Sequence, residues 1–233
     1  MNNAYRHELK FVISGSLYQE LSRVLAAMME RDSHVGSTGS YNIRSLYFDD
    51  LYRTAYQEKI DGVEIRRKYR IRIYNYSDSV ISLECKHKNG SYIRKEEIPL
   101  SREEYERMRN CDYSFLLHKD SPLAGEFFID ARTNLLRPAV IVDYDREPFV
   151  HPVGTVRITF DKNLQAISPE DDIFSPQSPG FSVLAPGEMI LEVKFTGKLP
   201  EKFRRVFKSY ALTQCSASKF CLCVDGLEHI LNH

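Results

Sequence analysis

Basic side chains recur at every second residue in several short stretches of this 233-residue sequence. Between residues 68 and 73 the even positions carry Lys68, Arg70 and Arg72, while the odd positions are Tyr, Ile and Ile. Successive side chains of a β-strand point to opposite faces of its sheet, so this alternation predicts a strand with one basic and one apolar face. Four further stretches alternate in the same way and place these residues on their polar faces: Arg6, Glu8 and Lys10; Glu84, Lys86 and Lys88; Arg157, Thr159 and Asp161; Glu192 and Lys194.

The composition of these polar faces indicates an anionic ligand. An antiparallel sheet with one face in water alternates in the same way without any ligand, and this remains an alternative. However, Lys and Arg recur at the same parity with few carboxylates among them. Two unit charges about 8 Å apart repel by about 2 kcal/mol at an effective dielectric constant of about 20. A barrel with a basic interior and helices over its apolar exterior would hold a polyanion, and Arg and Lys both suit phosphate.

Three glutamates share these polar faces: Glu8, Glu84 and Glu192. A carboxylate does not bind phosphate, but it can hold a divalent cation that bridges phosphate oxygens. Each glutamate could equally be the ion-pair partner that keeps a neighbouring cation in place. The alternation leaves both interpretations open, with Glu192 the strongest candidate for a metal ligand.

The elements that must position these side chains are mainly strands. Alternation predicts strands over residues 5–13, 41–48, 64–76, 80–88, 91–100, 137–149, 155–164 and 188–195. Helical spacing predicts helices over 16–28, 51–57 and 101–117 and one that begins at Pro200, with capping boxes at Ser16 and Ser101. Asp61-Gly62 and Asn89-Gly90 predict hairpin turns, and four prolines make 168–187 a long loop. We expect one α+β domain over residues 1–233, an antiparallel β-barrel with helices packed outside.

Several other notable side chains are expected to be structural. His7 and His87 lie at the parity of the apolar faces. Asp49 follows a predicted strand and is expected to cap the next turn or helix. The basic residues of the helix from Pro200 are expected to form a solvated face.

The overall composition restricts the class of protein. The chain has 42% hydrophobic residues, and its 32 Lys and Arg balance 32 Asp and Glu, which argues against a uniformly basic nucleic-acid binder. No apolar run approaches the roughly 18 residues of a spanning helix, and the first eight residues lack a signal core. We therefore expect a cytoplasmic protein. The five cysteines are expected to be reduced thiols without zinc-site spacing.

The ordered set of these stretches resembles the VTC domain, the polyphosphate polymerase domain of the vacuolar transporter chaperone complex. The matching motifs are Tyr5-Arg6-His7-Glu8-Leu9-Lys10-Phe11, Ser45-Leu46-Tyr47-Phe48-Asp49, Lys68-Tyr69-Arg70-Ile71-Arg72, Glu84-Cys85-Lys86, Tyr144-Asp145-Arg146, Val156-Arg157-Ile158, Leu191-Glu192-Val193-Lys194 and Ser218-Lys219-Phe220. The VTC domain belongs to the triphosphate tunnel metalloenzymes, alongside the CYTH phosphatases. The resemblance runs from Tyr5 to Val224, and its specificity lies in the order and spacing of the motifs.

The resemblance implies an antiparallel β tunnel that binds a nucleoside triphosphate or polyphosphate with Mn²⁺ or Mg²⁺. The implied activity transfers the γ-phosphate of ATP to a growing inorganic polyphosphate chain. The implied phosphate-binding cations are Lys10, Arg70, Arg72, Lys86, Lys95, Arg146, Arg157 and Lys219. Tyr144 and Ser218 would donate hydroxyl hydrogen bonds, and Glu192 would hold the metal.

Three positions refine this comparison. Lys88 stands where the known polymerase domain has a histidine, and is expected to bind substrate. Only one of the adjacent residues Arg94 and Lys95 can face the tunnel, and Ile98 three residues after Lys95 favours that lysine. Arg6 stands where CYTH proteins carry the first glutamate of a Glu-x-Glu-x-Lys pattern, which favours the polymerase branch over a carboxylate-rich triphosphatase.

Three functions remain open on the sequence. The first is a polyphosphate polymerase that uses ATP. The second is a metal-dependent triphosphatase, in which water attacks in place of polyphosphate. The third is a non-catalytic polyphosphate sensor, which the presence of Glu192 disfavours. Nucleic acid is not an expected partner, because the cations alternate with apolar residues. The protein could act with a separately encoded membrane protein, or alone.

Overall fold

The computed structural model describes residues 6–33, 35–36, 39–90, 92–153 and 156–231. Two compact units make up the chain. Unit 1 comprises 1–42, 144–164 and 184–217, and unit 2 comprises 43–143, 165–183 and 218–233. The predicted single domain over 1–233 stays a prediction. Tyr5, Ser91 and the side chain of Arg6, which the sequence interpretation used, lie outside the described part.

The strands are hydrogen bonded in the order β1-β10-β8-β7-β3-β4-β5-β6, with β2 beside β7 and β9 beside β8. Their bounds are β1 Arg6–Ser14, β2 Glu30–Arg31, β3 Tyr41–Asp49, β4 Ile65–Tyr74, β5 Ser77–Asn89, β6 Tyr92–Leu100, β7 Arg137–Val150, β8 Arg157–Ile167, β9 Gly180–Ser182 and β10 Glu188–Thr196. In the described part of the chain this ten-stranded sheet ends at β1 and β6, so it is open and does not close as the predicted barrel would. Residues 94–97 of β6 are all charged, which is typical of an edge strand that stays unpaired.

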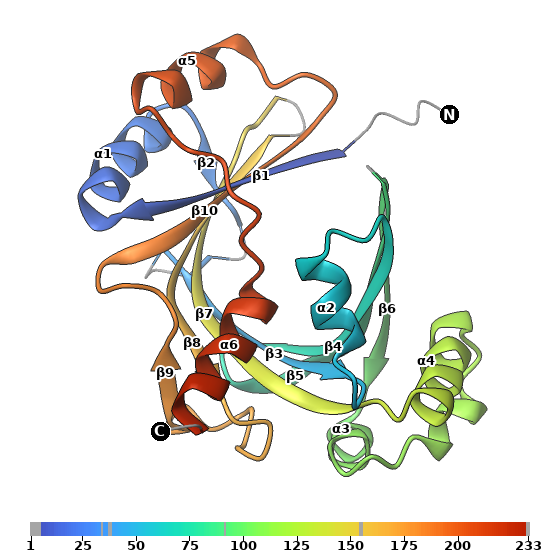
Figure 1. The fold of residues 1–233 in the computed structure, drawn as a ribbon. Helices are drawn as coiled ribbons and strands as arrows, with labels where there is room; N and C mark the ends of the chain where they lie inside the picture. Colours follow the sequence, from blue (N-terminus) through green and yellow to red (C-terminus); the bar gives the residue numbers. More distant parts are fainter. Residues whose placement is uncertain (1–5, 34, 37–38, 91, 154–155, 232–233) are drawn as a thin grey trace. The chain divides into compact units, whose positions relative to one another are not determined.

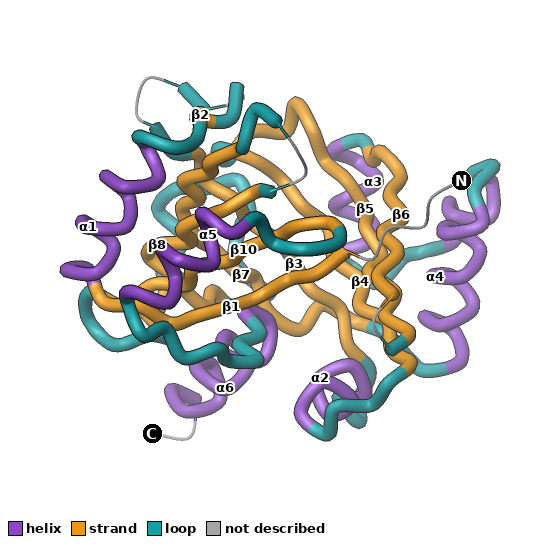
Figure 2. The backbone as a smooth tube through the Cα atoms, turned by 90° about the horizontal axis from the view of Figure 1, so that it is seen from above, coloured by secondary structure: helices purple, strands orange, loops and turns teal. Residues whose placement is uncertain are grey.

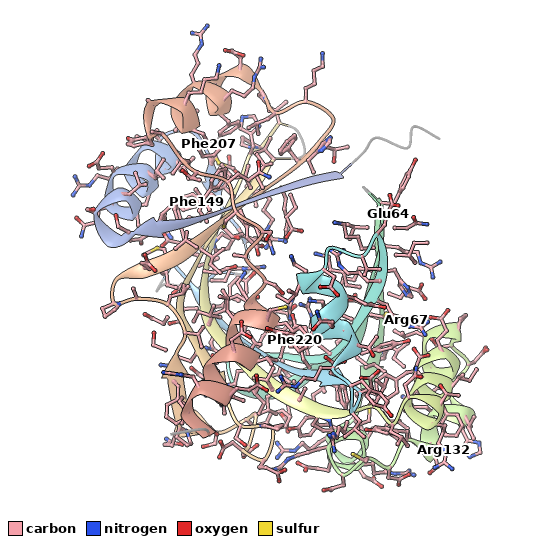
Figure 3. All side chains as sticks on the ribbon, viewed as in Figure 1. Glu64, Arg67, Arg132, Phe149, Phe207 and Phe220 are labelled. Carbon is pink, nitrogen blue, oxygen red and sulfur yellow. The ribbon has the colours of Figure 1, made fainter. Side chains whose placement is uncertain are left out.

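Unit 1 buries an apolar core under two helices, α1 (Gly15–Ala26) and α5 (Glu201–Ser209). Figure 1 shows both helices beside β1 and β10. The core consists of odd-numbered residues of β1 and β10, even-numbered residues of β8, and helix residues that include Leu21, Leu25, Phe203 and Phe207. Phe149 and Phe207 of this core are labelled in Figure 3. The predicted strand parity is therefore confirmed, because the apolar residues face the helices and Lys10 and Glu192 lie at the opposite parity.

Unit 2 has an equivalent core on one face of β3, β4, β5 and β6. Helices α3 (Arg102–Arg109) and α4 (Pro122–Thr133) and the 3₁₀ helix η1 (Ser114–His118) cover it, and α3 and α4 lie beside β5 and β6 (Figure 2). Tyr69, Ile71 and Ile73 of β4 are buried in this core. Helix α6 (Lys219–Leu231) contacts the opposite, polar face of these strands. There, Phe220 stacks on Tyr47 with ring centroids 5.0 Å apart. Helix α2 (Thr54–Ile60) contacts α6 through a 2.6 Å hydrogen bond from Tyr56 to Asp225.

Local capping explains where several helices begin. Ser101 and Glu104 form the predicted reciprocal capping box of α3. Helix α1 is capped by Ser14, which accepts a hydrogen bond from the Leu17 amide, so the predicted cap at Ser16 is wrong by two residues. Asp49 accepts hydrogen bonds from the amides of Ala55 and Tyr56 at 2.9 and 3.0 Å, which confirms its capping role.

Other predicted boundaries are wrong for identifiable reasons. The helix expected over 101–117 ends at Arg109, because Cys111 takes the left-handed conformation with φ of 60° and η1 follows. Asp61-Gly62 ends α2 instead of joining two strands, and Gly62 adopts a φ of 72° there. The loop predicted over 168–187 contains the short strand β9. Helices α4 and α6 have no counterpart among the predicted elements. Within the described residues, no helix has the length and apolar run needed to span a membrane.

Candidate functional site: two polar faces of the sheet

The polar face of unit 2 is organised in rows that cross neighbouring strands in register. One row, here called the Glu84 row, contains Tyr47, Arg70, Glu84 and Glu97. The next, called the lysine row, contains Lys68, Lys86 and Lys95. Further rows pair Arg72 with Ser45 and Ser82, and Arg66 with Lys88. Because Arg94 pairs with His87 and Lys95 with Lys86, Lys95 lies on the polar face and Arg94 on the other.

Glu84 is the counter-ion of the Glu84 row. Its carboxylate accepts hydrogen bonds from Arg70 Nε at 2.7 Å and lies 2.6 Å from Arg70 Nη2 and 2.8 Å from Lys95 Nζ. Burial alone would raise the pKa of Glu84, but Arg70, Arg72 and Lys95 outweigh it and lower that pKa to about 2. These contacts make Glu84 an ion-pair partner of Arg70 and Lys95.

Two hydroxyl groups also contact the arginines of this face. Arg70 Nη1 donates to Tyr47 Oη at 2.8 Å, and Arg72 Nε donates to Ser45 Oγ at 3.1 Å. Burial opposes ionisation of Tyr47, yet the charges of Arg70 and Arg72 lower its pKa overall. Both guanidinium groups are thus held in fixed orientations on rigid strands, as phosphate recognition requires.

The lysine row is the most basic feature of unit 2. Its three ammonium groups project from directly opposed positions of β4, β5 and β6, an arrangement that destabilises a sheet unless an anion or carboxylate compensates. Lys95 has such partners in Glu84 and Glu97, 2.8 and 2.5 Å away. Ser218, just before α6, accepts from the Cys221 amide as an N-cap residue does and lies 3.4 Å from Lys68 Nζ. Lys219 follows it and is buried.

In unit 1 the corresponding centre is Glu192 on β10. It lies in register between Lys10 of β1 and Thr159 of β8. Three cations surround its buried carboxylate: Lys194 Nζ at 3.2 Å, Arg146 Nη2 at 3.4 Å and Lys10 Nζ at 3.6 Å. Lys10 also lies 3.1 Å from Glu8 and donates to the carbonyl of Ala217 at 3.1 Å.

Arg146 and Arg157, the two arginines of unit 1 that are expected to bind phosphate, differ in how far they are already engaged. Arg146 is buried and makes a bidentate pair with Asp161, with both bonds at 2.7 Å, and it lies over the ring of Tyr144. Burial would lower the pKa of Arg146, but Asp161 above all keeps it well above the usual range. Arg157 pairs with Asp32 at 2.8 Å and contacts Tyr41 at 3.3 Å, and its side chain is 41% exposed. Arg157 is therefore the more accessible of the two to a ligand.

The carboxylates of unit 1 fit a metal ion that arrives with phosphate. Among the described residues, no group of three acidic, His or Cys side chains could hold a metal by itself. Glu192 and Glu8 each approach the same Lys10 nitrogen, so their oxygens lie near one another around one cationic centre. Mg²⁺ is usually held by only one or two carboxylates together with substrate phosphates, and Mn²⁺ also prefers oxygen ligands. Glu192 and Glu8, which are both paired with Lys10 in the structure, would be such a donor set.

The structure adds residues that the sequence comparison did not single out. Lys68 lies in the lysine row, and its signal was its shared parity with Arg70 and Arg72. Tyr47 binds Arg70, and Asp161 binds Arg146. Neither partnership is visible in the sequence, because each depends on which strands lie side by side.

Known structures identify the fold. A candidate adenylate cyclase from Bacillus halodurans superposes with a TM-score of 0.55 and 15% identity, covering 94% of this chain and 96% of that one. A candidate adenylyl cyclase from Hippeastrum, described as having a dominant triphosphatase activity, gives a TM-score of 0.56 and 13% identity, with 96% of each chain covered. Both have the triphosphate tunnel fold, and so does this protein.

The family follows from the sequence itself. The model of the VTC domain matches residues 5–227. The chain therefore belongs to the VTC domain family. A search among curated proteins found no sequence match.

Proposed function

We propose that this protein is a polyphosphate polymerase, which transfers the γ-phosphate of ATP to a growing chain of inorganic polyphosphate with the help of Mn²⁺ or Mg²⁺. The observation that carries the proposal is the lysine row beside the Glu84 row. Together these rows fix Lys68, Lys86 and Arg70 on neighbouring rigid strands at one polar face. A linear polyanion matches such an arrangement of neighbouring cations. Membership of the VTC family supports polyphosphate as that polyanion.

The reaction needs little covalent chemistry from the protein. A terminal oxygen of the polyphosphate chain attacks the γ-phosphorus of ATP, and the bond from that phosphorus to the β–γ bridging oxygen breaks. ADP leaves with the electron pair, and the polyphosphate chain is one phosphate longer. The attacking oxygen is already ionised, so no general base is required. The protein aligns the reactants and stabilises the charge of the transferring group.

The residues divide between these two tasks. We assign phosphate binding in unit 2 to Arg70, Arg72, Lys86, Lys88, Lys95, Ser218 and Lys219, and in unit 1 to Lys10 and Arg157. Glu192, with Glu8 beside it, would hold the divalent metal, which offsets negative charge on phosphate oxygens. Arg146 positions Glu192 through its 3.4 Å contact, and Tyr144 supports the Arg146 guanidinium.

A metal-dependent triphosphatase is the second candidate. Dominant triphosphatase activity is described for the Hippeastrum protein that shares the fold. The same residues would serve, with water in place of the polyphosphate oxygen as the attacking group. The two candidates therefore differ in the fate of the γ-phosphate and not in the binding groups.

Incubation with ATP and Mn²⁺, followed by separation of long polyphosphate from free phosphate on a gel, tests the proposal. The wild-type protein should form long polyphosphate, and Glu192→Gln should form none. Glu201→Gln is the matched control, because Glu201 is an exposed residue of α5 and should not affect the product. Free phosphate as the sole product would establish the triphosphatase instead. Absence of both products with any divalent metal would leave a non-catalytic polyphosphate binder.

A further inference from the structure

Lys68 differs from the other members of the lysine row in its partners. Its Nζ lies 4.6 Å from the centroid of the Phe220 ring, 3.4 Å from Ser218 Oγ and 3.9 Å from Cys221 Sγ. These three residues lie at the start of α6, where Figure 3 labels Phe220. None of them carries a carboxylate, and no ion pair of Lys68 is found within the described residues. Lys95, two strands away in the same row, contacts both Glu84 and Glu97.

The charged groups around Lys68 are mostly positive. Lys86 opposes it on β5, Arg66 lies two residues before it on β4, and the charge of Lys59 in α2 also acts on it. The pKa of Lys68 is lowered to about 8, and burial is the largest cause. The positive charges of Lys59 and Arg66 lower this pKa further. Cys221 and Tyr47 act in the opposite direction. Burial would lower the pKa of Lys95, but the nearby carboxylates of Glu84 and Glu97 outweigh burial and raise this pKa. One row therefore contains both a lysine that stays charged and a lysine that can lose its proton near neutral pH.

We propose that Lys68 is a further phosphate-contacting residue of this face, and that it takes up a proton when a polyphosphate binds. The inference rests on the proposed function, because its ligand is the polyanion proposed there. In the anion-free protein, part of the Lys68 population is neutral amine against the Phe220 ring. A phosphate oxygen near the lysine row stabilises the ammonium form, and the proton comes from the solvent. The neutral amine of Lys68 lowers the repulsion that three charged lysines would otherwise impose on this face when no anion is bound.

The expected proton uptake depends on pH in a defined way. At pH 8 about half of the Lys68 side chains are neutral, so binding should take up about 0.5 proton. At pH 6.5 nearly all are already protonated, and the uptake should fall below about 0.1 proton. Tripolyphosphate can itself lose a proton on binding, so the informative quantity is the difference between wild-type protein and variants.

Titration calorimetry of tripolyphosphate without metal, in buffers of different ionisation enthalpy, measures this difference. Lys68→Arg keeps the charge but cannot lose its proton, so at pH 8 it should take up about 0.5 proton fewer than the wild-type protein. Lys68→Met should show the same reduction and bind about tenfold more weakly at pH 6.5. Lys119→Arg is the matched control, because Lys119 pairs with Glu104 of α3 and has no assigned phosphate contact, and its proton uptake should equal that of the wild-type protein.

The outcomes separate this inference from the proposed function. Equal proton counts for the wild-type protein and Lys68→Arg would overturn the role of Lys68, while measurable tripolyphosphate binding would leave the proposed function intact. Unchanged affinity of Lys68→Met at pH 6.5 would also overturn the contact. Failure of the wild-type protein to bind tripolyphosphate at either pH would overturn the proposed function together with the inference.

Discussion

Substitution of Glu84 by Gln tests whether this carboxylate is a structural counter-ion. Its side chain is only 3% exposed and is surrounded by Arg70 and Lys95. The folded protein lowers the pKa of Glu84 from 4.5 to about 2. A lowering of this size corresponds to about 3 kcal/mol of preferential stabilisation of the charged form.

The sign of the effect follows from the lowered pKa. A carboxyl group that is more acidic in the folded state stabilises the fold fully above its unfolded-state pKa near 4.5, and the stabilisation is lost as the pH falls through about 2. At pH 7, Glu84→Gln should therefore reduce the free energy of unfolding by about 3 kcal/mol. Tripolyphosphate should restore part of this loss, because it binds the folded state and provides the same cations with negative charge.

Urea unfolding followed by circular dichroism at pH 7, with and without tripolyphosphate, measures both effects. Glu97→Gln is the matched control, because Glu97 contacts the same Lys95 at 2.5 Å but its side chain is 58% exposed. An exposed ion pair contributes less than about 1 kcal/mol, so the control should lose little stability. Equal losses for the two variants would refute the counter-ion role of Glu84.

Three further outcomes are expected. Ile71→Asp should reduce the free energy of unfolding by about 3 kcal/mol or more in a urea titration, since Ile71 is fully buried in the unit 2 core; a harmless substitution would mean that the two faces are assigned the wrong way round. Arg146→Met should destabilise the protein by about 3 to 5 kcal/mol because the buried carboxylate of Asp161 loses its bidentate partner, and adding Asp161→Leu should recover most of that loss in thermal unfolding. Glu192→Gln should bind tripolyphosphate in chelator as tightly as the wild-type protein or more tightly, whereas its Mn²⁺-dependent turnover of ATP should fall by orders of magnitude; unchanged turnover would exclude the metal role.

The faces of the strands could be predicted from the sequence because side chain parity is a local property. In β4, the alternation of Arg70 and Arg72 with Ile71 and Ile73 identified the basic and apolar faces correctly. The capping of α3 and the role of Asp49 were equally local. These features depend on residues close together in the chain, so no knowledge of strand order was needed.

The partners of the polar residues depend on strand order and could not be predicted. Glu84 remained either a metal ligand or a counter-ion until the register placed it opposite Arg70. The bidentate pair of Arg146 and Asp161 joins β7 to β8, and no spacing in the sequence indicates it. The environment of Lys68 could not be predicted either, because the start of α6 creates it and lies about 150 residues later in the chain.

Helices α4 and α6 were missed for different reasons. Helix α4 begins at Pro122, and a proline in the first turn after Ser121 was an available signal of a helix start. Helix α6 contains Gly226, which weakens its helical propensity, and residues 220–224 are all apolar, which weakens its periodicity. Helix α6 matters for the site, because it brings Phe220 and Cys221 to Lys68.

The most direct test of the proposed polymerase is the fate of the γ-phosphate of ATP. Wild-type protein is incubated with ATP labelled at the γ-phosphate and with Mn²⁺, and the label is divided between acid-precipitable polymer and free phosphate while ADP is quantified. A polyphosphate polymerase should place nearly one labelled phosphate in polymer for each ADP formed. Label found entirely in free phosphate, or ATP left unconsumed, would contradict the proposed function.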